Sequence, residues 1–159
     1  MNNMANEVKI DGNLNASISE MQQEFPKYFK AALMAGASVL KMNTKESFKN
    51  VLPAATRPNP RYNDTLVDAV ANGKLYEDEV TVHVMGRNEP GSGAYRARFF
   101  EVGTKDRYQK KRNGKKLKKN KYLGKIRPLR FFANTVSSSE QQVMAEMEAV
   151  IDNLFKKYN

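Results

Sequence analysis

Apolar side chains recur every three or four positions along two long segments of this chain, one towards each end. In the first segment the positions are Ile18, Met21, Phe25, Phe29, Leu33, Gly36, Val39 and Leu40. This spacing predicts an amphipathic helix with one buried stripe. Pro26 interrupts the pattern as a kink or as a first-turn residue, so we expect the main helix from about Pro26 to Lys49. Ser17 to Glu20 fits a capping box, and the polar residues 1–16 predict a flexible arm or a short strand.

The second stripe follows Pro128, which can open a helix because its fixed φ angle suits the first turn. The apolar positions of this stripe are Leu129, Phe132, Val136, Val143, Met147, Val150, Ile151, Leu154 and Phe155. Within it, Ser137 to Glu140 offers another capping box, which either starts a new helix or marks a polar patch on a continuing one.

Two segments in the middle of the chain alternate between apolar and polar residues. The run EVTVHVM from Glu79 predicts a half-buried strand. Ala94 to Val102 alternates again, and the intervening Gly86 to Gly93 has the composition of a turn. We therefore expect these two segments to form an antiparallel pair.

Before these strands, Asp64 can cap a short helix from Thr65 to Ala71, which Asn72-Gly73 would end. The order helix, strands, helix predicts an α+β fold, in which an antiparallel sheet packs against a long N-terminal helix and a C-terminal helix. The chain has 159 residues, which suits a single domain spanning 1–159.

Composition excludes several classes of protein. The chain has no cysteine, so it can form no disulfide, iron–sulfur or thiolate-zinc site. No apolar run approaches the roughly 20 residues that span a bilayer, so no membrane contact is expected. The N-terminus lacks a basic region followed by an apolar one, and we therefore expect a soluble protein made in a cytoplasm.

Candidate catalytic groups are sparse. His83 is the only histidine, and without a partner to orient it we expect a solvent-facing or hydrogen-bonded strand residue and not a catalytic or metal-binding one. The acidic run Glu77-Asp78-Glu79 fits a solvated strand end better than a metal site. Gly91-Ser92-Gly93 lacks the longer glycine spacing, the lysine and the following helix of a phosphate loop. We therefore expect no enzymatic activity, no metal and no cofactor.

Charge is distributed very unevenly. The 21-residue segment Lys105–Lys125 holds 11 Lys and Arg and one acidic residue, Asp106, which gives it a net charge of +10. The whole chain holds 27 basic and 17 acidic residues, so the remainder has 16 of each and is neutral. Asn113-Gly114 at the middle of the segment is a strong hairpin-turn signal. The sequence thus predicts a protruding cationic arm, inserted at 105–125 into a neutral body.

Such an arm suggests contact with a polyanion: duplex DNA, RNA or an acidic protein surface. The candidate contact residues are Lys110, Lys111, Arg112, Lys115, Lys116, Lys118, Lys119 and Lys121. The excess of Lys over Arg favours contact with phosphate groups without sequence specificity. Tyr108 and Tyr122 either stack on bases or pack at the ends of a hairpin. The alternative to polyanion contact is a solvated, mobile loop whose charge aids solubility.

The flanks of this segment carry a family resemblance. Tyr95-x-Ala97-x-Phe99-Phe100-Glu101-Val102-Gly103-Thr104, a variable insert, and then Arg127-Pro128-Leu129-x-x-Phe132-Ala133 resemble the tail-completion or head–tail joining proteins of long-tailed DNA phages. The resemblance covers about residues 20–157. Its most distinctive blocks are Glu101 to Thr104 and Arg127-Pro128. Leu129 departs from the pattern, because the family usually has an aromatic residue directly after the proline.

In physical terms the motif residues suggest mainly structural roles. Gly103 allows a sharp turn after a strand, Thr104 can hydrogen-bond that turn, and Pro128 presets the start of the last helix. Glu101 is expected to pair with a basic residue across the sheet or across a subunit boundary. Tyr95, Arg127 and Phe132 complete the set of motif residues.

The resemblance implies a non-enzymatic virion assembly protein, made in the host cytoplasm, that forms a homo-oligomeric ring at the head–tail junction. Its implied partners are further copies of itself and the neighbouring neck and tail-tube proteins, with DNA in the lumen as a candidate partner of the basic loop. A ring would multiply the charge of the arm. The alternative is a stand-alone nucleic-acid-binding protein without sequence specificity that uses the basic hairpin.

Overall fold

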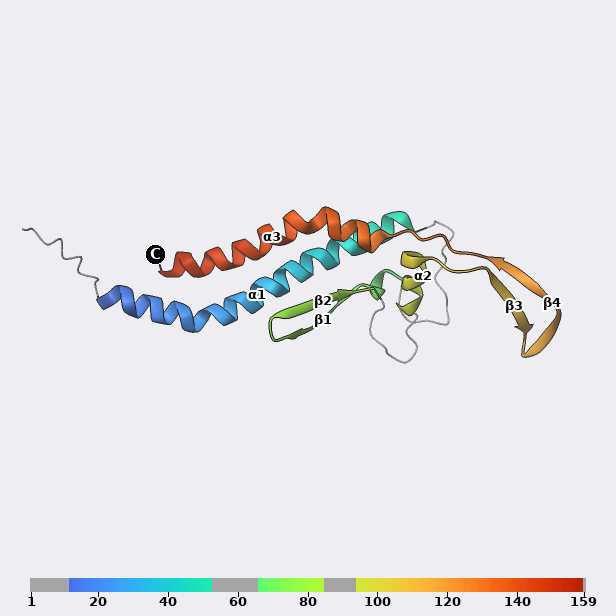
Figure 1. Cartoon of the computed structure of the whole chain (residues 1–159), viewed down its shortest axis with the longest axis horizontal. Coiled ribbons are helices and arrows are strands. Elements are labelled where there is room, and N and C mark those ends of the chain that lie inside the picture. The colour runs from blue at the N-terminus through green and yellow to red at the C-terminus, as the bar shows by residue number, and fades with distance from the viewer. Residues whose placement is uncertain (1–11, 53–65, 85–93, 159) are drawn as a thin grey trace, which may run out of the picture.

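Two long antiparallel helices form the framework of the protein. The computed structural model describes residues 12–52, 66–84 and 94–158, and the side chains from residue 17 onwards. Helix α1 spans Gly12–Val51 and helix α3 spans Phe131–Tyr158. The two lie side by side, with the C-terminal end of α3 near the N-terminal half of α1 (Figure 1). The observed fold is α+β, as the sequence predicts.

Helix α1 is longer than its sequence pattern predicts. It continues through Pro26 instead of beginning there, so residues 12–16 are helical rather than an arm or a strand, and Ser17 lies inside the helix. Proline removes one helical hydrogen bond, a cost that packing on both sides can offset. Phe25 and Phe29 stack with ring centroids 6.1 Å apart, and Glu24 forms an ion pair of 2.7 Å with Lys157 of α3. These contacts hold both halves of α1 in one helix.

Small and polar residues bring α1 and α3 close together. A Cβ atom placed on Gly36 would lie 2.8 Å from Met147 Cγ, so this position has no room for a side chain. Further along, the Asn43 amide donates hydrogen bonds to Ser139 Oγ (3.0 Å) and Gln142 Oε1 (2.8 Å). Ser139 lies within the continuous helix α3, so the capping-box sequence at Ser137 to Glu140 marks a polar patch and not a new helix start.

The strand predicted from Glu79 is confirmed, but its partner is not the predicted one. Strand β2 (Glu79–His83) pairs antiparallel with β1 (Ala71–Tyr76), and Ala71 lies opposite His83. The predicted short helix is reduced to a 3-10 turn, η1 (Val67–Ala69), and Asn72-Gly73 lie in the strand. Pairing with β2 gives hydrogen-bond partners to the backbone N–H and C=O groups of β1. A helix that ended at Asn72-Gly73 would instead leave its last carbonyl groups without partners in the helix. Asp64 and Gly86–Gly93 lie outside the described residues.

The segment 94–102 is helical, which corrects the prediction of a strand. It forms a 3-10 turn η2 (Ala94–Arg96) and a short helix α2 (Ala97–Val102). Tyr95 and Phe99 are four residues apart and meet edge-to-face at 6.1 Å, a contact that helical spacing produces. Ala97 is fully buried, and its small side chain lets the helix approach the core closely. Tertiary contacts thus override the alternating pattern.

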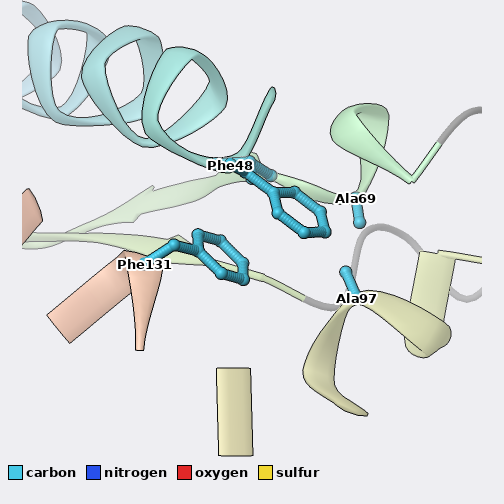
Figure 2. Packing of buried hydrophobic residues seen from close by; sticks show 5 residues of the cluster. Phe48, Ala69, Ala97 and Phe131 are labelled. Atoms are coloured by element: carbon cyan, nitrogen blue, oxygen red, sulfur yellow. The ribbon is translucent and has the colours of Figure 1, made fainter. Parts of the chain in front are cut away.

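The core lies where these elements converge, at the end of the helix pair (Figure 2). Phe48 of α1 and Phe131 of α3 stack in nearly parallel planes with ring centroids 4.0 Å apart. Ala69, Val70 and Ala97 complete the buried cluster. Phe131 is the first residue of α3 and belongs to this buried cluster. The cluster therefore fixes the position at which α3 begins after the cationic segment.

Candidate functional site

The cationic segment forms the predicted hairpin. Strand β3 (Arg107–Arg112) pairs antiparallel with β4 (Lys115–Gly124), and together they extend beyond the end of the helix pair (Figure 1). The two residues at the turn, Asn113 and Gly114, have φ angles of 48° and 78°. Positive φ at both positions is what a two-residue hairpin turn requires, and Asn-Gly supplies it at little cost.

Like charges face one another across the hairpin. Lys111 lies opposite Lys116 and Arg112 lies opposite Lys115, a pairing that destabilises an antiparallel ladder. Between Gln109 and Lys111 the register shifts, so that Lys110 alone stands opposite residues 117–120 of β4. A bulge of this kind bends the strand and increases its twist.

The candidate contact residues are all exposed: Lys110, Lys111, Arg112, Lys115, Lys116, Lys118, Lys119 and Lys121. Two ion pairs occur among the described residues, Lys45–Asp68 and Lys157–Glu24, and both lie away from the hairpin. Within the part of the chain that the structure describes, these eight cations therefore have no acidic partner. An external polyanion would relieve their mutual repulsion.

The base of the hairpin is held together internally. The rings of Tyr108 and Tyr122 lie across the two strands with centroids 5.3 Å apart, so the tyrosines pack on each other. The Tyr122 hydroxyl donates a hydrogen bond of 3.0 Å to Asp106 Oδ1, which raises the pKa of Tyr122 above its ordinary value. The Arg107 guanidinium donates to the carbonyls of Leu123 and Gly124 at 3.4 and 3.3 Å. Asp106 and Arg107 therefore support the arm itself.

Glu101 has a different role from the ion pair that the sequence suggested. Its carboxylate accepts hydrogen bonds from the backbone N–H groups of Phe132 (2.9 Å) and Ala133 (3.1 Å). These are the second and third residues of α3. A carboxylate at a helix N-terminus satisfies free donors and interacts favourably with the helix dipole. Glu101 is thus a remote cap that joins α2 to the start of α3.

Backbone hydrogen bonds join the same two segments. Leu129 N donates to Phe100 O at 2.7 Å, and Arg130 N donates to Glu101 O at 3.3 Å. Closer to the hairpin, Thr104 N donates to Ile126 O, and Ile126 N donates to Thr104 Oγ1. We call the two hydrogen-bonded segments, 100–104 and 126–133, the junction. Thr104 therefore bonds the opposite segment and not its own turn.

Two further motif residues shape the junction. Gly103 has a φ angle of 76°, and a Cβ atom there would lie 2.9 Å from Pro128 Cδ, so only glycine fits without strain. Gly103 ends helix α2 and not a strand. Pro128 precedes α3 by three residues, because the helix begins at Phe131. The expectation that Pro128 opens the helix was wrong for this reason.

The remaining motif residues lie around the junction. Tyr95 is half exposed and packs on Phe99. Arg127 is exposed and lines an open hollow at the base of the hairpin together with Lys105 and Lys125. Phe132 packs against the buried core. The structure thus brings the two distinctive sequence blocks together at one place, directly under the cationic hairpin.

Sequence reasoning missed the capping role of Glu101, although a signal was present. The residues directly before α3 are Pro128-Leu129-Arg130, and none of them offers the Ser, Thr, Asp or Asn side chain of an ordinary cap. A helix start with no local cap needs an acceptor from elsewhere in the chain. The distance of 31 residues between Glu101 and Phe132 hides this partner from any local pattern.

Within residues 12–52, 66–84 and 94–158, no group of three or more His, Cys, Asp or Glu could hold a metal ion. Among the helices described there, none is long and apolar enough to cross a membrane. Comparison with models of known protein families, with characterised proteins and with solved structures gave no match.

Proposed function

We propose that this protein is a structural virion component of the tail-completion or head–tail joining type, which assembles into a homo-oligomeric ring at the neck of a phage. The observation that carries the proposal is the junction. Residues of the two segments that resemble this family meet here: the Glu101 carboxylate accepts a hydrogen bond from Phe132 N, and Gly103 lies directly against Pro128. The resemblance thus corresponds to one structural unit, which presents a variable loop.

The small number of buried apolar side chains supports a role in assembly. Among the described residues, five buried apolar side chains belong to the two long helices of 40 and 28 residues: Ala32, Ala37, Phe48, Phe131 and Leu154. Apolar side chains remain exposed along both helices, with Phe25 at 44%, Met42 at 66% and Met144 at 51% of their surface. Exposed apolar surface on a framework of this kind is typical of a subunit that completes its burial against other copies.

The hairpin supports a contact function for the same ring. Its net charge of +10 is held on an arm whose base is fixed by the junction, so each copy would present the charge at the same place. In a ring the fields of the copies add, which strengthens attraction to DNA in a lumen or to an acidic neighbouring protein.

Two measurements test the proposal. Light scattering coupled to size-exclusion chromatography gives the mass of the assembly, and negative-stain electron microscopy shows whether it is a closed ring. We expect a closed multimer of one size that does not grow as protein concentration rises. A protein that stays monomeric throughout the concentration series would contradict the ring.

A second candidate, a stand-alone nucleic-acid-binding protein, is favoured by the unpaired cations of the hairpin. Binding through eight phosphate contacts would give a slope of about −7 when log affinity is plotted against log salt concentration. Deleting residues 107–123 should then abolish retention of duplex DNA. Tight binding by a monomer, lost on this deletion, would favour this candidate over the ring.

A further inference from the structure

Helix α3 carries an acidic surface that forms no ion pair with any residue the structure describes. From Phe131 to Phe155 it holds four acidic residues and no Lys or Arg. Three of the four, together with a methionine, recur every four positions and form one row on the helix: Glu140, Met144, Glu148 and Asp152. All four residues are exposed, and within the described residues none of the three carboxylates forms an ion pair. We call this row the acidic ridge.

The acidic ridge borders an apolar hollow. Met144, Glu148 and Asp152 line this hollow together with Phe29 and Ala32 of α1. The surface therefore offers carboxylates and apolar contact side by side. A matching partner would present cations next to exposed apolar side chains.

The hairpin has that composition. Leu123 is 48% exposed and Tyr108 is 52% exposed, and both lie among the lysines of β3 and β4.

The length of the hairpin strand also agrees with the length of the ridge. Glu140 to Asp152 spans about 18 Å of helix, and the six residues of β3 span about 17 Å. Alternate strand residues are about 6.6 Å apart, close to the rise of about 6 Å between ridge positions.

The hairpin cannot reach the acidic ridge of its own chain. It extends beyond the end of the helix pair at which α3 begins, whereas the ridge lies further along α3 (Figure 1). The hydrogen bonds between Thr104 and Ile126, and those of Glu101 to α3, fix the base of the hairpin in this direction. Folding back would break the junction, so contact must come from another molecule.

We propose that the hairpin of one copy docks on the acidic ridge of the next copy. The inference rests on the proposed self-assembly and names its contact. Hairpin and ridge are different surfaces, so the contact is head-to-tail, the kind that closes into a ring when the rotation between copies allows it. The ridge carboxylates would repel nucleic acid, and they complement the cations of the hairpin, which form no ion pair among the described residues.

Two full-length variants test the contact by complementation. The first variant has a less cationic hairpin and an intact ridge; it carries K111Q, K116Q, K118Q and K119Q. The second variant has a neutral ridge and an intact hairpin; it carries E140Q, E148Q and D152N. The mixture of the two variants should form a 1:1 heterodimer whose affinity falls as salt rises and exceeds the affinity of either variant for itself. Exposed ion pairs are individually weak, so we expect each variant alone to self-associate about tenfold more weakly than the wild type.

A matched control removes three acidic residues elsewhere. E77Q, D78N and E79Q alter the exposed end of the β1–β2 hairpin and should leave assembly unchanged. Circular dichroism checks that every variant retains its helices.

Zero-length cross-linking tests the contact directly in the wild type. In a mixture of isotopically light and heavy protein, it should join hairpin lysines to Glu140, Glu148 or Asp152 of a different copy.

The outcomes separate this inference from the proposed ring. A ridge variant that assembles like the wild type overturns the docking contact and leaves the ring in place. A wild type that forms open chains through cross-links between hairpin and ridge supports the contact and contradicts the ring. A monomeric wild type whose hairpin binds duplex DNA, with no heterodimer from the two variants, overturns both.

Discussion

Replacing Glu101 by alanine removes the remote cap of helix α3. The carboxylate accepts two backbone hydrogen bonds, from Phe132 and Ala133, at a helix start that has no local cap. We expect the variant to lose stability and to loosen the attachment of the cationic hairpin, because the same junction holds both.

The expected loss follows from the contacts. An N-cap side chain contributes about 1 kcal/mol, and a negative charge near a helix N-terminus adds about 0.3–1 kcal/mol. Glu101 is partly buried and makes two bonds, so the loss should be about 2 kcal/mol. For a chain of this size, about 2 kcal/mol lowers the melting temperature by about 4–8 °C. Glu101→Gln keeps one acceptor oxygen and should lose about half as much.

Thermal unfolding followed by circular dichroism measures the loss of stability, and amide hydrogen exchange locates it. Exchange should become faster at Phe132 and Ala133 and should change little in the middle of α3. Glu146→Ala is the matched control, because Glu146 is exposed on the same helix and has no described hydrogen bond. The reasoning fails if Glu101→Ala and Glu146→Ala unfold at the same temperature, or if the two amides exchange as slowly as in the wild type.

Three further predictions concern single side chains. Gly103→Ala should destabilise the fold by about 1–3 kcal/mol more than Gly114→Ala in urea unfolding, because both glycines have similar positive φ angles but only Gly103 contacts Pro128; equal losses would contradict this. The pKa of Tyr122 is raised by its hydrogen bond to Asp106, so its contribution to stability is present below pH 10 and is lost as pH rises through the raised pKa. Tyr122→Phe should remove that alkaline step, and an unchanged profile would show that the bond is absent. The pKa of Glu24 is lowered from 4.5 by Lys157, so its contribution is present above that value and is lost as pH falls through the lowered pKa. Glu24→Gln should flatten stability between pH 5 and pH 3 relative to wild type, and parallel curves would rule the ion pair out.

The local elements of the candidate site could be predicted from the sequence. Asn113-Gly114 predicts the hairpin turn, and the density of lysine predicts an exposed arm, because both depend on neighbouring residues only. The helical periodicity near each end predicts α1 and α3, although packing carries α1 through Pro26. Alternation at 94–102 gave the wrong element, since a nine-residue pattern does not reveal which residues will contact the core.

The sequence by itself determined that this protein has two amphipathic helices, a neutral body and a cationic hairpin. Helical spacing, turn residues and local charge depend on residues close together in the sequence. They therefore do not change with the contacts that distant segments form. Only the tertiary structure decided that Glu101 caps α3, that β2 pairs with β1, and that the hairpin extends away from the acidic ridge. Each of these depends on contacts between distant segments, whose energies are set by burial and geometry once the helices have packed.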